Sequence, residues 1–117
     1  MLFRIDPAAA EPIYAQIAAQ VRIAAVRGEV APGERLPAAR DLAESLQVNL
    51  HTVLRAYQEL RDTGLIELRR GRGAVVATDA ARDLAELRDA VETLADVARR
   101  SHVPPDTTLA LVKEALR

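Results

Sequence analysis

Residues 36–60 read LPAARDLAESLQVNLHTVLRAYQEL, and their spacing decides the fold. Apolar residues recur at helical intervals in the first half, which predicts a short helix that begins at Pro37 and ends near Leu46. Asn49 then predicts the N-cap of a second helix, since its side chain can accept a hydrogen bond from a backbone N–H of the first turn. The apolar stripe of this second helix consists of Val53, Ala56, Tyr57 and Leu60. We therefore expect two helices joined by a tight turn.

A further helix is predicted upstream of this segment. Apolar residues recur at spacings of three and four over residues 12–27, and Gly28 can end that helix in the left-handed conformation. Residues 2–5 are expected to form a short strand. The Pro32-Gly33 pair predicts a type II turn between this helix and the one that begins at Pro37.

A β-hairpin is expected after the helix that Asn49 caps. Residues 65–68 and 74–77 are rich in strand-forming residues. The connection between them reads Arg69-Arg70-Gly71-Arg72-Gly73. Helix, helix, turn, helix and hairpin is the order of a winged helix-turn-helix, so the expected fold is mainly α with a small β-hairpin. We assign residues 1–78 to this domain.

After residue 78 the pattern changes, and Asp79 predicts the cap of a helix of about twenty residues. Its apolar residues repeat at alternating spacings of three and four, as in a coiled-coil seam; they are Leu84, Leu87, Val91, Leu94 and Ala98. Residues 103–105 break this helix, and Asp106 predicts the cap of a last short one. The apolar side of the last helix carries Leu109, Val112 and Leu116. An apolar seam exposed to water is unusual in a monomer, so residues 79–117 are expected to be a two-helix dimerisation tail.

The charge of the chain is unevenly distributed. Its formal net charge is −1, which alone argues against a nucleic-acid-binding protein. Residues 1–78, however, carry ten arginines against nine acids (+1), whereas residues 79–117 carry six basic residues against eight acids (−2). Because the local field governs contact with phosphate, the three arginines of residues 69–73 weigh more than the net charge.

Several other classes of protein are disfavoured by the sequence. The chain has no cysteine, so disulfides and thiolate metal sites are excluded and a reducing cytoplasm is expected. No signal peptide is visible, and no apolar run approaches the roughly 20 residues of a membrane helix. The two histidines, His51 and His102, show no metal-binding spacing with nearby acids. Since no phosphate-binding loop or nucleophilic triad is recognisable either, we expect neither an enzyme nor a cofactor.

The helix that Asn49 caps presents a polar side opposite its apolar stripe. At about 100° per residue, this side carries His51, Arg55, Gln58 and Asp62, with Thr52 and Glu59 flanking it. Asp62 lies too far along the helix to contact DNA and would repel phosphate. In a helix-turn-helix, the N-terminal residues of such a helix contact base edges in the major groove. Leu50 either contacts a thymine methyl group or closes the turn against the preceding helix.

The hairpin connection is a second expected contact. Arg70 and Arg72 flank Gly71, whose lack of a side chain lets the tip approach the minor groove of DNA. Arginine in that groove gains from its enhanced negative potential.

Ordered motifs over residues 12–77 resemble the GntR family of bacterial regulators. They are PIYAQI (12–17), GEVAPG (28–33), LPAARDLA (36–43), VNLHTV (48–53), AYQEL (56–60), GLI (64–66) and RGRG (70–73). The sequence departs from the family pattern at Ala38, where Ser is usual, and at Leu50, where Pro or Arg is usual.

The resemblance implies a dimeric repressor that binds double-stranded operator DNA, with Asn49 and Gly73 joining the residues named above at the interface. It also implies that Arg40 contacts DNA; alternatively, Arg40 pairs with Glu44 one turn later. The short tail resembles that of the YtrA subfamily, where the tail serves dimerisation. The resemblance also implies that the gene lies in an operon with an ABC transporter, as is common for these regulators.

A winged-helix module that binds protein or RNA is the alternative that the slightly negative net charge favours. A small-molecule effector is neither indicated nor located by the sequence; the dimer interface and the groove between tail and winged domain are the places where one would fit.

Overall fold

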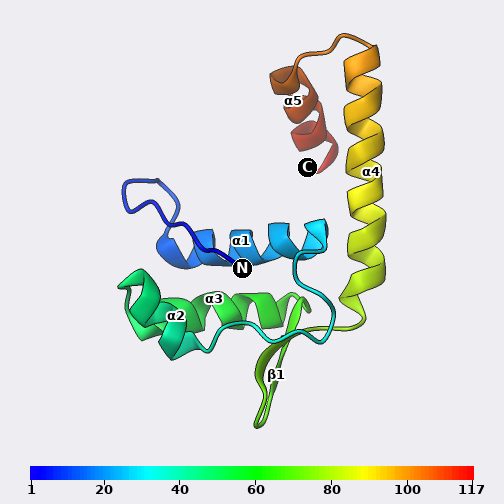
Figure 1. Cartoon of the computed structure of the whole chain (residues 1–117). Coiled ribbons are helices and arrows are strands. Elements are labelled where there is room, and N and C mark those ends of the chain that lie inside the picture. The colour runs from blue at the N-terminus through cyan, green and yellow to red at the C-terminus, as the bar shows by residue number, and fades with distance from the viewer. The chain divides into compact units, whose positions relative to one another are not determined.

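The computed structural model describes the backbone of residues 1–117 and every side chain except those of residues 81 and 82. The chain divides into two compact units, Met1–Ala85 and Glu86–Arg117. Its elements, coloured along the chain in Figure 1, are α1 (Ile13–Arg27), α2 (Ala39–Leu46), α3 (Leu50–Asp62), β1 (Ile66–Arg69), β2 (Gly73–Val76), α4 (Ala80–Arg100) and α5 (Pro105–Ala115). This mainly α order with one antiparallel hairpin is the one predicted.

The first unit surrounds one apolar core. α1 packs against α3, and Figure 1 shows these helices side by side with the hairpin projecting beyond them. The largest fully buried side chains come from these elements; they are Ile17, Val21, Val53, Leu60, Ile66 and Val75. Each such burial stabilises the fold by about 1.5–3 kcal/mol, so the core fixes α3 relative to the hairpin.

α1 ends as predicted at Gly28, which has φ 78°. The Gly28 N–H donates to the Ala25 carbonyl and the Glu29 N–H to the Ala24 carbonyl, the pattern of a Schellman motif. The strand expected over residues 2–5 is wrong, because no neighbouring backbone pairs with this segment in the described sheet.

Two glutamines of α1 supply the hydrogen bonds that a neighbouring strand would otherwise give to this segment. The side-chain amide of Gln20 exchanges hydrogen bonds with the backbone N–H and carbonyl of Arg4. Gln16 does the same for Asp6, at 2.8 Å and 2.9 Å. Because Gln16 and Gln20 lie one turn apart, their amides hold the N-terminal segment extended along the helix.

α2 begins two residues later than predicted, at Ala39 instead of Pro37. The reason is that the preceding residues pair with the hairpin: the Leu36 N–H donates to the Ala74 carbonyl at 2.8 Å, and Arg35 forms an isolated bridge with Val75. Backbone held extended in this way cannot join the helix. The end of α2 at Leu46 is as predicted.

The hairpin is shifted from its expected bounds. Arg69 pairs with Gly73, so β1 and β2 are joined by residues 70–72 and not by the five residues expected. The pairing extends to Ile66 opposite Val76, and both of these side chains are buried. The connection at the tip of this hairpin, which we call the wing, is therefore two residues shorter than predicted.

The boundary between the units lies after Ala85 and not after residue 78, because Ala80 and Leu84 pack against the core of the first unit. α4 begins right after Asp79 and ends at Arg100, close to the predicted length. α5 begins at Pro105, so Asp106 lies in its first turn and is not its cap as expected. Of the helices in the described chain, none combines the length and apolar character needed to cross a bilayer.

Candidate nucleic-acid interface

An open groove of about 580 Å³ runs between α3 and the first strand of the hairpin. Its lining residues are His51, Leu54, Arg55, Tyr57, Gln58 and Leu68. All except Leu68 belong to α3, the second helix of the helix-turn-helix. The groove therefore brings the polar side of α3 next to the wing.

The start of α3 is fixed by Asn49. Its side-chain oxygen accepts a hydrogen bond from the His51 N–H at 2.8 Å, which is the predicted cap. This bond uses the oxygen and leaves the amide NH₂ of Asn49 exposed to donate elsewhere. His51 is exposed in the first turn, whereas Thr52 is half-buried and does not line the groove.

Arg55 is exposed on the groove side of α3. Its guanidinium carbon lies 3.8 Å from the centroid of the Tyr14 ring on α1, within the range of a cation–π contact. Gln58 lies almost one turn further along the same side and is also exposed. Asp62 lies at the end of α3, where its carboxylate pairs with Arg61 at 3.5 Å.

Its burial favours one of the two roles considered for Leu50. Leu50 is half-buried and packs against the core, as expected if it closes the turn. Sequence reasoning missed Leu54 and Leu68, which are 43% and 49% exposed and line the groove together. The available signal was that Leu54 falls outside the apolar stripe of α3, so its side chain had no place in the core.

Arg40 is exposed on α2. Among the ion pairs of the described side chains, none joins Arg40 to Glu44, the alternative partner. Its guanidinium is therefore available to a ligand.

The tip of the wing consists of exposed residues. Gly71 has φ 80° and Gly73 has φ 75°, a backbone region that side-chain-bearing residues rarely adopt. The Arg69 guanidinium is engaged by Glu67 at 2.7 Å. Arg70 and Arg72 form no ion pair with any side chain that the structure describes, so the tip carries two available positive charges.

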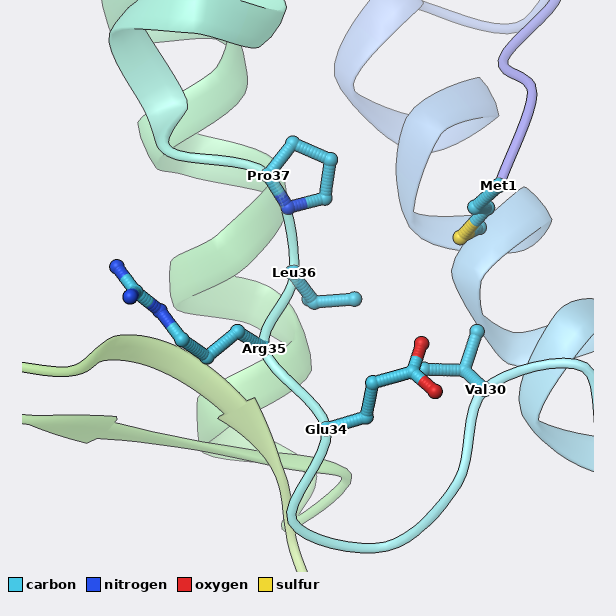
Figure 2. A pocket seen from close by; sticks show the side chains of 6 residues that line it. All are labelled: Met1, Val30, Glu34, Arg35, Leu36 and Pro37. Carbon is cyan, nitrogen blue, oxygen red and sulfur yellow. The ribbon is translucent and has the colours of Figure 1, made fainter.

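A second, smaller depression of about 300 Å³ lies near the N-terminus. Figure 2 shows the Glu34 carboxylate directed towards Val30 and the Arg35 side chain directed to the opposite side of the chain. These two charges diverge and form no paired polar site. Within the described part of the chain, no group of three or more His, Cys, Asp or Glu residues could hold a metal ion.

The chain is similar in sequence to known transcription regulators. Residues 13–76 match the family model described as bacterial regulatory proteins, gntR family. The HTH-type transcriptional repressor YtrA of Bacillus subtilis (strain 168) is 40% identical over 85 residues, which are 73% of this chain and 65% of YtrA. The match thus spans less than two thirds of that relative's own length.

Solved structures share the fold. YtrA from Sulfolobus acidocaldarius, a GntR-family transcription factor, has a TM-score of 0.63 at 37% identity and covers 81% of this chain and 99% of that one. AraR(DBD) in complex with operator ORX1 has a TM-score of 0.56 at 28% identity, covering 65% of this chain and 93% of the other. The winged helix-turn-helix predicted from the sequence is therefore confirmed.

Proposed function

Because the chain belongs to the gntR family of bacterial regulatory proteins, we propose that it binds operator DNA as a homodimer and represses a small operon. The observation that carries the proposal is the groove on α3, where exposed His51, Arg55 and Gln58 lie beside a wing with two available arginines. A regulator of this kind acts in the cytoplasm and needs neither a catalytic site nor a cofactor.

The proposed contacts divide into base readout and phosphate contact. Arg55 has the geometry for bidentate binding of guanine, and Gln58 has it for adenine, both in the major groove. His51 and the free amide of Asn49 lie at the N-terminal end of α3, the end that a helix-turn-helix inserts first. Arg40, Arg70 and Arg72 supply positive charge around this helix for phosphate and minor-groove contact.

Dimerisation is proposed from the second unit. In α4, Leu87, Val91 and Leu94 are exposed although they are large and apolar. A partner copy that covers them would present two α3 helices to the half-sites of a two-fold operator. Repression would then follow from occupation of a promoter that polymerase needs.

The test is selection of bound duplexes from a genomic DNA library with the full chain, followed by gel shifts at several salt concentrations. We expect one recurring two-fold site, and we expect Arg55→Ala to weaken binding to it by roughly 1–3 kcal/mol. A shuffled duplex of the same composition is the control. Failure to enrich any duplex, with binding to RNA or protein instead, would favour an interaction module.

A further inference from the structure

Two contacts join α1 to α3, one at Arg55 itself and one at Glu59, four residues later. Tyr14, in the first turn of α1, places its ring 3.8 Å from the Arg55 guanidinium carbon. Arg22, further along α1, pairs with Glu59 at 3.3 Å. We propose that α1 positions Arg55 for contact with DNA: Tyr14 supports its guanidinium, and Arg22 holds the Glu59 carboxylate away from it. This inference rests on the proposed function.

Tyr14 is a fixed platform. It is half-buried and packs against the core of the first unit. The neighbouring Gln16 is buried, and its amide hydrogen bonds to the backbone of Asp6 and Glu11 hold the N-terminal segment against α1. A ring with two side-chain torsions that packs against the core loses little further freedom when a cation rests on it.

Support by a ring leaves the binding capacity of Arg55 intact. All five N–H donors of a guanidinium lie in its plane, so contact through its face leaves the donors free. Arg55 forms no ion pair with any described side chain. The group is therefore held in place while its donors remain available to a base or a phosphate.

Glu59 is the natural competitor for those donors. It lies four residues after Arg55 on α3, a spacing at which opposite charges pair on a helix surface. Arg22 occupies its carboxylate instead, and the cation that reads DNA is left without an intramolecular anion. α1 thus contributes to recognition although neither Tyr14 nor Arg22 lines the groove.

The first test is a double-mutant cycle on the selected operator, measured by fluorescence anisotropy with the full chain. Tyr14→Leu should weaken binding roughly two- to fivefold, the value of an exposed cation–π contact, whereas Tyr14→Phe keeps the ring and should bind like wild type. In an Arg55→Ala background, Tyr14→Leu should have no further effect. Equal weakening in both backgrounds would overturn the positioning role.

The second test does not depend on whether Tyr14→Leu folds. Arg22→Ala releases Glu59 to pair with Arg55 and should weaken binding about twofold. Adding Glu59→Gln removes the competing charge and should restore wild-type affinity. If Glu59→Gln does not restore it, Arg22 acts by another route and the inference is wrong.

The proposed function and the positioning role of α1 fail under different results. Absence of duplex binding by the wild-type protein would overturn the proposed function, and the positioning role with it. The positioning role alone would be overturned if wild type binds the operator and either of two results is found. One is that Tyr14→Leu binds as tightly as wild type, and the other is that Glu59→Gln does not rescue Arg22→Ala.

Discussion

The hydroxyl of Tyr57 donates a 2.6 Å hydrogen bond to the carbonyl oxygen of Pro37. Tyr57 is buried in the middle of α3, whereas Pro37 belongs to the extended segment before α2. The bond ties together the two parts of the helix-turn-helix at the point where the sequence predicted the helix to have begun already. The prediction that Tyr57 belongs to the apolar stripe of α3 is confirmed.

Tyr57→Phe should lower the free energy of unfolding by about 1 kcal/mol at neutral pH, because the Pro37 carbonyl loses its donor. Burial raises the pKa of Tyr57 in the folded state above its ordinary value near 10. The unfolded chain therefore loses this proton first, so the stability due to Tyr57 is complete below pH 10 and declines as the pH rises above it. Urea unfolding of wild type and Tyr57→Phe at pH 7 and above pH 10 measures the difference in their free energies of unfolding. This difference should shrink at high pH, and a constant difference would contradict the prediction.

Leu54 and Leu50 provide a matched pair on α3. Leu54→Ala should change the base preference of the selected site at a thymine position, since Leu54 is exposed in the groove, and should change stability by no more than about 0.5 kcal/mol. Leu50→Ala should instead lower the free energy of unfolding by roughly 1–3 kcal/mol, because it removes packing against the core. Thermal unfolding and site selection with each variant separate the two effects. The roles would be reversed if only Leu50→Ala altered the selected sequence.

The sequence predicted the helices and the core residues of the first unit because periodicity, the Asn49 cap and the Gly28 terminator are local features. It mispredicted the segments whose hydrogen bonds are non-local. Residues 33–36 bond to β2, and residues 4–6 bond to glutamine side chains ten or sixteen residues later. No spacing rule shows which distant group will satisfy a backbone N–H.

The candidate site could be predicted in part for the same reason. His51, Arg55 and Gln58 share a side of one helix, so their grouping follows from helical geometry. The contribution of Leu68, Tyr14 and Arg22 depends on contacts between elements, which only the folded chain brings together.

The wing offers a test with an internal control. Arg70→Ala with Arg72→Ala should flatten the plot of log K against log salt concentration by about 0.9 for each phosphate that the variant no longer neutralises. Arg69→Ala should change the slope less, because Arg69 is already paired with Glu67 at 2.7 Å. Gel shifts over a series of salt concentrations give the slopes. An unchanged slope in the double variant would remove the wing from the interface.

The proposed dimer depends on the apolar residues of α4 and of the last helix. The expected seam is divided by the structure: Leu84 packs against the core of the first unit, while Leu87, Val91 and Leu94 are 51%, 53% and 40% exposed. Ala98 is half-buried, and Val97, which was not expected, is exposed as well. On α5, Leu109 is exposed and Val112 is half-buried, and Leu116, the C-cap of this helix, is exposed. A soluble chain rarely leaves so much apolar surface open to water, which favours a partner over the second unit.

Leu87→Glu with Leu94→Glu should therefore produce a monomer with a folded winged domain and much weaker operator binding, because association would bury unpaired charge. Thr93→Glu, next to Leu94 but off the seam, is the matched control for Leu94→Glu alone and should leave the dimer intact. Truncation after Ala85 should have the same effect as the double variant, and it spares Ala80 and Leu84, which a cut after residue 78 would remove from the core. Light scattering gives the mass of each protein, and circular dichroism verifies the fold. A dimer that survives the truncation would place the interface in the first unit instead.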